Sequence, residues 1–210
     1  MSDVRILARR FTQSALGRYG YSLQPLDASA AESEWGLSDS DRLIVRIACR
    51  YSMAGTRRMA ALVSSVEYCI REGIQGDFVE CGVWRGGSAL AIALKLEQMG
   101  VTDRNLWLYD TFEGMTAPGA LDVDAATGSE ADALMRLTEV GDGNNVWAFA
   151  TLDEVRKTLS LSAYPVSRFI FVVGDVTTTL ASQAPERVSL LRLDTDFYDS
   201  TKTEMEILYP

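Results

Sequence analysis

The stretch Gly76–Ser88 constrains the fold of this chain more than any other. It reads Gly-Asp-Phe-Val-Glu-Cys-Gly-Val-Trp-Arg-Gly-Gly-Ser, a short apolar run followed by closely spaced glycines. The apolar run is typical of a strand buried on both faces. The glycines permit a tight turn and a close approach of the backbone to a ligand. The stretch therefore predicts a strand, a ligand-binding loop and a helix that begins near Gly87.

The spacing of these glycines argues against a dinucleotide as the ligand. A dinucleotide-binding loop follows Gly-x-Gly-x-x-Gly, whereas Gly82, Trp84 and Gly87 occupy the three glycine positions here. Without the middle glycine the backbone cannot approach a pyrophosphate closely, and Glu80 would repel one. S-adenosylmethionine carries a sulfonium, an ammonium and no phosphate, so it suits Glu80 better. An NAD-dependent dehydrogenase would share the fold and stays open as an alternative.

Composition and charge favour one α/β domain with a small-molecule partner. A chain of 210 residues with 47% hydrophobic residues can bury an adequate core without disulfide bonds. The formal charge of −9 argues against a nucleic-acid-binding surface, which needs clustered Lys and Arg. We therefore expect a domain at 38–210 that binds no nucleic acid.

The first 37 residues are loosely patterned, with arginines among scattered apolar residues. Their apolar stretches are too short for a signal peptide or a membrane span. We expect an N-terminal arm at 1–37 that is solvated or packs against a partner, such as a second copy of the chain. A basic amphipathic segment that touches a membrane is the less favoured alternative.

Histidine is absent from the chain, which removes the usual general base and the usual transition-metal ligand. Any chemistry must then depend on carboxylates, and hard oxygen ligands select Mg²⁺ or Ca²⁺. The three cysteines lie in apolar patterns without metal-ligand spacing, so reduced thiols in a cytoplasmic protein are expected.

Helical and strand patterns alternate along the rest of the chain, which predicts right-handed crossovers and a parallel, Rossmann-like sheet flanked by helices. A helix behind Ser38 would bury Leu43, Ile44, Ile47 and Ala48. The further helices are expected from Thr56 to Gly73 and at 87–98, 152–160, 177–183 and 201–208, and the strands at 78–81, 106–109, 168–173 and 188–193. Residues 113–146, helical only at 129–138, are interpreted as a substrate lid or as a disordered surface loop.

Three acids follow the later strands and should meet Glu80 at the carboxyl edge of the sheet. Asp110 stands where an acid commonly binds ribose hydroxyls, although it could also cap a helix or lie in a turn. Asp175 and Val176 would lie near adenine. Asp194 comes too early to cap the last helix, so it is the candidate catalytic or metal-binding acid, with a buried structural acid as the alternative.

Three stretches in the expected order resemble the signatures of the macrocin O-methyltransferase family. They are Gly76–Ser88, Tyr109-Asp110-Thr111-Phe112-Glu113-Gly114-Met115 and Leu190-Leu191-Arg192-Leu193-Asp194-Thr195-Asp196-Phe197-Tyr198. Tyr51-Ser52-Met53 also resembles an upstream Tyr-Thr-Met of the family. The resemblance implies a class I methyltransferase that uses S-adenosylmethionine and Mg²⁺ to methylate a sugar hydroxyl of a secondary-metabolite glycoside, such as a macrolide, in antibiotic biosynthesis.

The resemblance also implies roles for individual residues. Asp110 would bind the ribose, with Thr111 and Phe112 beside it, and Asp194 would be the metal-binding catalytic acid. The residues implied to hold the methionine end of the cofactor are Glu80, Gly82, Trp84, Gly86 and Ser88, and Met53 would lie beside it.

The family pattern continues beyond the position of Pro210, into a strand that ends in two further aspartates of the metal site. A helix after a parallel strand normally returns the chain to the sheet, whereas 201–208 returns to no further strand. We therefore expect an incomplete form of the enzyme. A non-catalytic cofactor-binding or scaffold protein is the second alternative.

Overall fold

The computed structural model describes residues 36–209, except 124–129, 132–134 and 136–147. The N-terminal arm predicted at 1–37 lies almost wholly outside this range. So do most of the predicted lid at 113–146 and most of the predicted helix at 129–138. The compact unit discussed below begins at Ser38.

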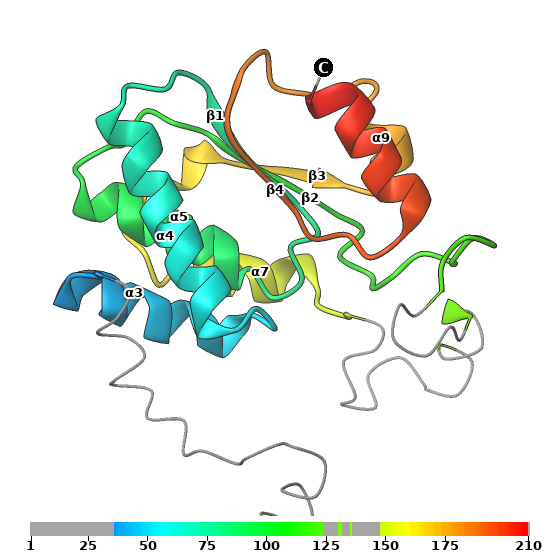
Figure 1. Ribbon diagram of the computed structural model, residues 1–210, viewed down its shortest axis with the longest axis horizontal. Helices are drawn as coiled ribbons and strands as arrows, with labels where there is room; N and C mark the ends of the chain where they lie inside the picture. Colours follow the sequence, from blue (N-terminus) through cyan, green and yellow to red (C-terminus); the bar gives the residue numbers. More distant parts are fainter. Residues whose placement is uncertain (1–35, 124–129, 132–134, 136–147, 210) are drawn as a thin grey trace, which may run out of the picture. The chain divides into compact units, whose positions relative to one another are not determined.

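A four-stranded parallel sheet forms the centre of this unit, in the order β3-β2-β1-β4 (Figure 1). The sheet confirms the predicted α/β class, and its strands lie within two residues of the predicted positions. They are β1 (Asp77–Cys81), β2 (Leu106–Asp110), β3 (Phe169–Val173) and β4 (Val188–Leu193). Because all pairings are parallel, the carboxyl ends of the strands meet at one edge.

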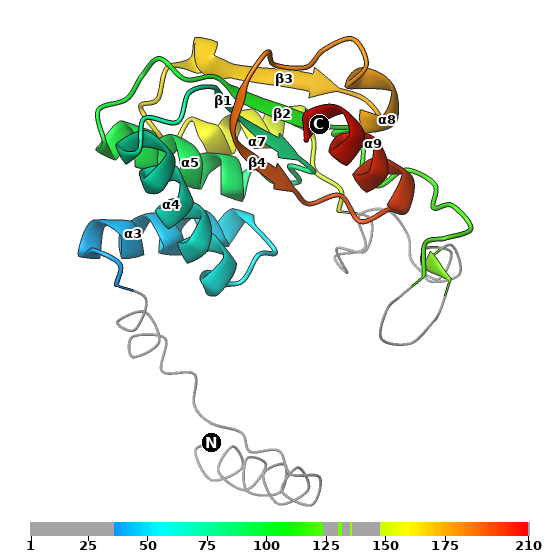
Figure 2. The ribbon, with the colours of Figure 1, turned by 45° about the horizontal axis from the view of Figure 1, so that its top comes forward.

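Helices cover both faces of the sheet (Figures 1 and 2). One face carries α3 (Asp39–Ala48), α4 (Thr56–Arg71), α5 (Gly87–Gln98) and α7 (Leu152–Leu159). The other carries α8 (Val176–Thr179) and α9 (Tyr198–Leu208). Two 3₁₀ turns, η1 (Cys49–Tyr51) and η2 (Val166–Arg168), complete the described elements. No helix among them is long and apolar enough to cross a membrane.

Side chains alternate between the two faces of each strand and fill a separate core layer on each side. Val79, Cys81 and Tyr109 pack with Leu180 and Leu208 beneath α8 and α9. Phe78 and Glu80, the intervening residues of β1, consequently point to the side of α4 and α5. Glu80 is thus a carboxylate within a hydrophobic layer, and it is almost fully buried.

The buried face of α3 differs from the predicted one. Leu43 is 51% exposed, and the inward positions are Asp41, Ile44, Val45 and Ala48. These positions have the spacing of one helical face, but its first member is an acid. Asp41 is buried because the Lys95 ammonium lies 2.7 Å from its Oδ1. Hydrophobicity alone therefore predicts Ile44 and Ala48 correctly but wrongly includes Leu43 and misses Asp41 and Val45.

The last two helices also differ from their predicted bounds. Helix α8 is four residues long instead of spanning 177–183, and the N–H groups of Ser182 and Gln183 both bond the Thr179 carbonyl in the turn that follows. Helix α9 begins at Tyr198 rather than Thr201. Asp122, far away in sequence, accepts a hydrogen bond from the Tyr198 N–H at 2.7 Å and caps this helix from outside.

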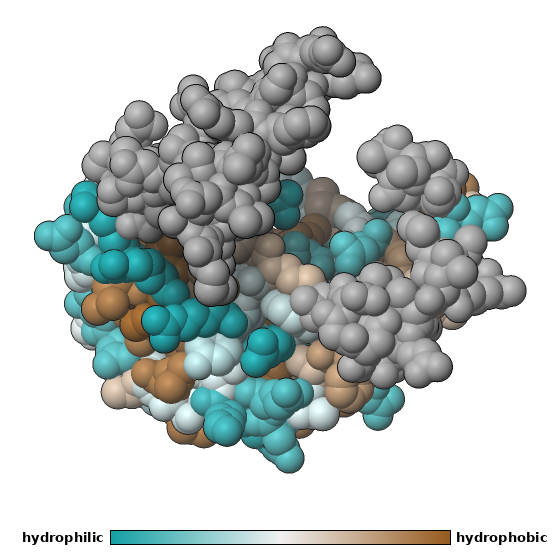
Figure 3. Space-filling view, turned by 90° about the horizontal axis from the view of Figure 1, so that it is seen from below, coloured by the Kyte–Doolittle hydropathy of each residue, from teal (hydrophilic) through white to brown (hydrophobic). Residues whose placement is uncertain are grey.

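The coloured part of the face in Figure 3 is mixed in hydropathy. Figure 3 shows hydrophilic and hydrophobic side chains interspersed over the face seen from below. Leu43 on α3 and Tyr68 on α4 are more than half exposed, each as a single large hydrophobic side chain on the outer face of its helix. Isolated exposed residues of this kind are normal in a folded domain.

Candidate functional site at the carboxyl edge of the sheet

A cavity of about 380 Å³ lies where the four strands end, within the size range of small-molecule sites. Loops that follow β1, β2, β3 and β4 all contribute to its wall. The predicted site residues that line it are Met53, Gly82, Trp84, Asp110, Thr111, Asp175, Val176 and Asp194. The other predicted residues, Glu80, Gly86, Ser88 and Phe112, do not line the cavity and are buried behind it.

Glu80, Arg192 and Asp194 form a chain of charges beside this cavity. The Arg192 guanidinium donates from Nη1 to Glu80 Oε1 at 3.0 Å and from Nη2 to Asp194 Oδ2 at 2.8 Å. Burial raises the pKa of Glu80 to about 7, although the Arg192 charge opposes the shift. Glu80 Oε2 is buried and accepts no hydrogen bond from the described residues. Because Glu80 does not line the cavity, its carboxylate can favour a cationic ligand there through its charge rather than by direct contact.

The Asp110 carboxylate holds two loops together. Its Oδ2 accepts from the N–H groups of Val83 and Trp84 at 2.7 and 2.9 Å, and its Oδ1 accepts from the Phe112 N–H at 2.8 Å. Trp84 and Phe112 both have positive φ, at 48° and 55°, which is unfavourable for side chains of this size. Asp110 thus stabilises two strained positions, a role that adds to its predicted contact with ribose.

Two loop glycines pack against protein backbone. A Cβ on Gly82 would lie 2.5 Å from the Asp194 carbonyl oxygen, and one on Gly87 would lie 2.6 Å from that of Tyr51. The predicted reason for these glycines was close approach to a ligand. The described structure shows a further reason, a close approach of the β1 loop to the β4 loop and of α5 to η1.

Asp175 caps a short helix at the cavity wall. Its Oδ1 accepts hydrogen bonds from the Thr177 N–H at 2.8 Å and from the Thr177 hydroxyl at 2.7 Å. Val176, the next residue, is mostly buried in the core beneath α8. Both residues line the cavity, as expected for a position near adenine.

Two acids follow β4 at the opposite wall. The Asp194 side chain is half exposed, and its Oδ1 accepts no hydrogen bond from the residues that the structure describes. Burial, followed by the nearby charge of Asp194, raises the pKa of Asp196. The described residues contain no group of three His, Cys, Asp or Glu side chains placed to hold a metal ion.

Arg58, Arg192 and Asp196 are site residues that were not predicted from the sequence. Arg192 had a detectable signal, because it is the one charged residue of the apolar strand β4, and it faces Glu80 in the register of β1 and β4. Asp196 follows the Asp194 candidate by two residues. Arg58 had no signal, because it lies on an exposed part of α4 among other arginines.

Comparison with known proteins gives the family of the chain. The sequence model of the macrocin O-methyltransferase family (TylF) matches residues 38–210. Over 160 residues, the chain is 33% identical to 8-demethyl-8-(2,3-dimethoxy-alpha-L-rhamnosyl)-tetracenomycin-C 4'-O-methyltransferase of Streptomyces olivaceus. Over the same length it is 30% identical to mycinamicin III 3''-O-methyltransferase of Micromonospora griseorubida. These alignments cover 76% of this chain and 58% and 60% of the two relatives.

Solved structures agree with this grouping. The O-methyltransferase NovP is 31% identical and superimposes with a TM-score of 0.64, covering 76% of this chain and 62% of NovP. The calicheamicin methyltransferase CalS11 shares the fold at 16% identity, with a TM-score of 0.53 over 82% of this chain and 72% of CalS11. The chain belongs to the macrocin O-methyltransferase family.

Proposed function

We propose that this chain binds S-adenosylmethionine and serves the methylation of a sugar hydroxyl on a secondary-metabolite glycoside. The observation that carries the proposal is the acid-lined cavity at the carboxyl edge of the sheet, backed by the unpaired and buried Oε2 of Glu80. The names of two relatives support a glycoside acceptor, because one denotes action on a rhamnosyl tetracenomycin and the other on mycinamicin III.

The residues present fit this cofactor. Glu80 would attract the ammonium electrostatically, since its carboxylate is buried directly behind the cavity wall. Trp84 lies in the loop between β1 and α5, and its indole Nε1 is buried without a hydrogen-bond partner in the described structure. Asp110 would orient the ribose, and Asp175 and Val176 would border the adenine. When bound, S-adenosylmethionine supplies an electrophilic methyl group on a sulfonium.

A second cavity offers a place for the acceptor. It has a volume of about 580 Å³ and shares Met115, Asp196 and Phe197 with the first. Its remaining lining comes mainly from Leu121, Val123 and α9. A glycoside bound in this cavity would extend into the first cavity past Asp194 and Asp196, the two acids that follow β4. We propose it as the acceptor site.

Asp194 is the proposed acceptor of the hydroxyl proton. Arg192 holds Oδ2 at 2.8 Å, which fixes the side chain and leaves Oδ1 facing the cavity region as the atom that would take the proton. A carboxylate is a much weaker base than the alkoxide of a sugar hydroxyl, so positioning must contribute much of the effect.

The described residues do not by themselves fit a magnesium site. Mg²⁺ prefers six oxygen ligands, and Asp194 already pairs with a guanidinium that repels a cation. We therefore assign no step to Mg²⁺.

Calorimetric titration of the chain tests the proposal. We expect binding of S-adenosylhomocysteine and no measurable binding of NAD, because the loop lacks the middle glycine of a dinucleotide site. Tighter binding of NAD would favour the dehydrogenase alternative. Binding of S-adenosylhomocysteine without methyl transfer to any glycoside would favour a non-catalytic cofactor-binding protein.

A further inference from the structure

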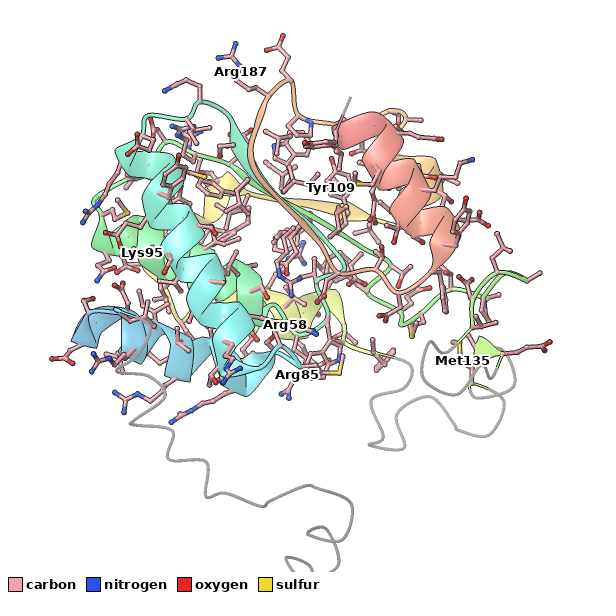
Figure 4. All side chains as sticks on the ribbon, in the orientation of Figure 1. Arg58, Arg85, Lys95, Tyr109, Met135 and Arg187 are labelled. Atoms are coloured by element: carbon pink, nitrogen blue, oxygen red, sulfur yellow. The ribbon has the colours of Figure 1, made fainter. Side chains whose placement is uncertain are left out.

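Arg58 is the cation of the cavity wall. It is exposed, its side chain lines the cavity, and it makes no hydrogen bond or ion pair within the described residues. Figure 4 shows it near the N-terminal end of α4. Two nearby arginines differ from it. Arg57 is exposed but does not line the cavity, and the Arg85 guanidinium lies 5.8 Å from the ring centroids of both Tyr51 and Trp84.

The other charged residues that line this cavity are all acids, namely Asp110, Asp175, Asp194 and Asp196. The chain as a whole has a formal charge of −9. An anionic group on a ligand would therefore be repelled everywhere in the described wall except beside Arg58. A guanidinium is also suited to a carboxylate, because its planar fork can donate two parallel hydrogen bonds.

We infer that Arg58 binds the carboxylate of the amino-acid part of S-adenosylmethionine. The inference depends on the proposed function, since it assigns one end of the same ligand. Met53 and Ala54, a few residues before Arg58 in the chain, also line the cavity. Arg58 and Glu80 would then divide the recognition of the amino acid, with the cation binding its carboxylate and the buried acid attracting its ammonium.

The test compares two ligands and two variants. S-adenosylhomocysteine and its decarboxylated analogue differ in the carboxylate alone. Arg58→Gln and Arg57→Gln remove the same charge from adjacent positions, and only the first changes the cavity. We expect Arg58→Gln to weaken binding of S-adenosylhomocysteine roughly ten- to hundredfold, as for loss of a charge-assisted contact, and to change binding of the analogue less than about twofold. Arg57→Gln should change neither, and Arg58→Lys should restore part of the lost affinity.

Each result decides a different point. Unchanged affinity of Arg58→Gln for S-adenosylhomocysteine would overturn the inference while leaving the proposed function intact. An equal loss for both ligands would also overturn it, because the arginine would then act on the shape of the cavity rather than on the carboxylate. Failure of the unmodified chain to bind S-adenosylhomocysteine would overturn the proposed function, and the inference with it. Thermal unfolding should be unchanged in both variants, since neither side chain has a partner in the described structure.

Discussion

Glu80 and Arg192 face each other on the adjacent strands β1 and β4, with Oε1 and Nη1 3.0 Å apart. The same guanidinium reaches Asp194 at 2.8 Å. One arginine therefore connects the buried acid behind the cavity at the carboxyl edge of the sheet with the half-exposed acid at its wall. A substitution of Glu80 should consequently affect the Asp194 side chain through Arg192, although these two acids make no direct hydrogen bond in the described structure.

Arg192→Met should destabilise the chain by about 3 kcal/mol, because it leaves a buried carboxylate without its cation. Denaturant unfolding followed by fluorescence measures this. The double variant Glu80→Gln with Arg192→Met should recover much of the loss, because the buried charge is then absent as well. Strictly additive effects of the two changes would contradict a direct pairing.

Glu80 should make stability depend on pH. Its pKa is raised from 4.5 to about 7, mainly by burial, so the folded chain holds this proton more tightly than the unfolded chain. The contribution of the protonated form is fully present below pH 4.5 and is lost as the pH rises through 7. Unfolding free energies of the chain and of Glu80→Gln, measured from pH 4.5 to 8, should therefore diverge, with the unmodified chain losing more. Parallel curves would show that Glu80 has an ordinary pKa.

The sequence predicts the local features of this fold well, since they depend on neighbouring residues. Hydrophobicity and glycine spacing predict strand β1, the loop after it and helix α5, including the start of this helix at Gly87. Contacts between distant segments were not predicted. The Asp122 cap on α9 and the Lys95 partner of Asp41 join residues 76 and 54 positions apart, and no local pattern marks either pair.

The candidate site shows the same division. The order of acids after successive strands placed Asp110, Asp175 and Asp194 around one cavity, because parallel strands bring their ends together. The sequence did not reveal that both Asp110 carboxylate oxygens accept hydrogen bonds from backbone N–H groups, since these bonds depend on the folded path of two loops.

Asp110→Ala should reduce both stability and cofactor affinity, because it releases three backbone N–H groups and the two positive-φ residues that they hold. We expect a loss of about 2–3 kcal/mol in unfolding free energy. Asp110→Asn keeps one acceptor oxygen, so its stability and its affinity should lie between those of the unmodified chain and those of Asp110→Ala. If Asp110→Ala lowers affinity for S-adenosylhomocysteine with no change in unfolding, the carboxylate serves the ligand alone.

Lys95→Met should be among the most destabilising single changes in the helical layer. The Lys95 ammonium is almost fully buried and lies 2.7 Å from Asp41 and 2.6 Å from Glu67, so it joins α5 to α3 and α4 (Figure 4). Its removal leaves a buried acid unpaired, at a cost of about 3–5 kcal/mol. The control is Lys202→Met, whose exposed pair spans 3.7 Å and should contribute less than about 0.5 kcal/mol. Similar losses in the two variants would contradict the difference in burial.

Magnesium should bind this chain weakly, and Asp194 is the residue that tests why. One oxygen of Asp194 pairs with Arg192, and the described residues provide no cluster of three acids, so water would have to supply most ligands of the ion. Adding about 1 mM Mg²⁺ should therefore raise the unfolding temperature by less than about 1 °C, since weak binding stabilises little. Asp194→Asn should behave like the unmodified chain in this titration and should keep its affinity for S-adenosylhomocysteine within a few-fold. Saturable magnesium binding that disappears in Asp194→Asn would instead show that this acid is a metal ligand, as the family resemblance implies.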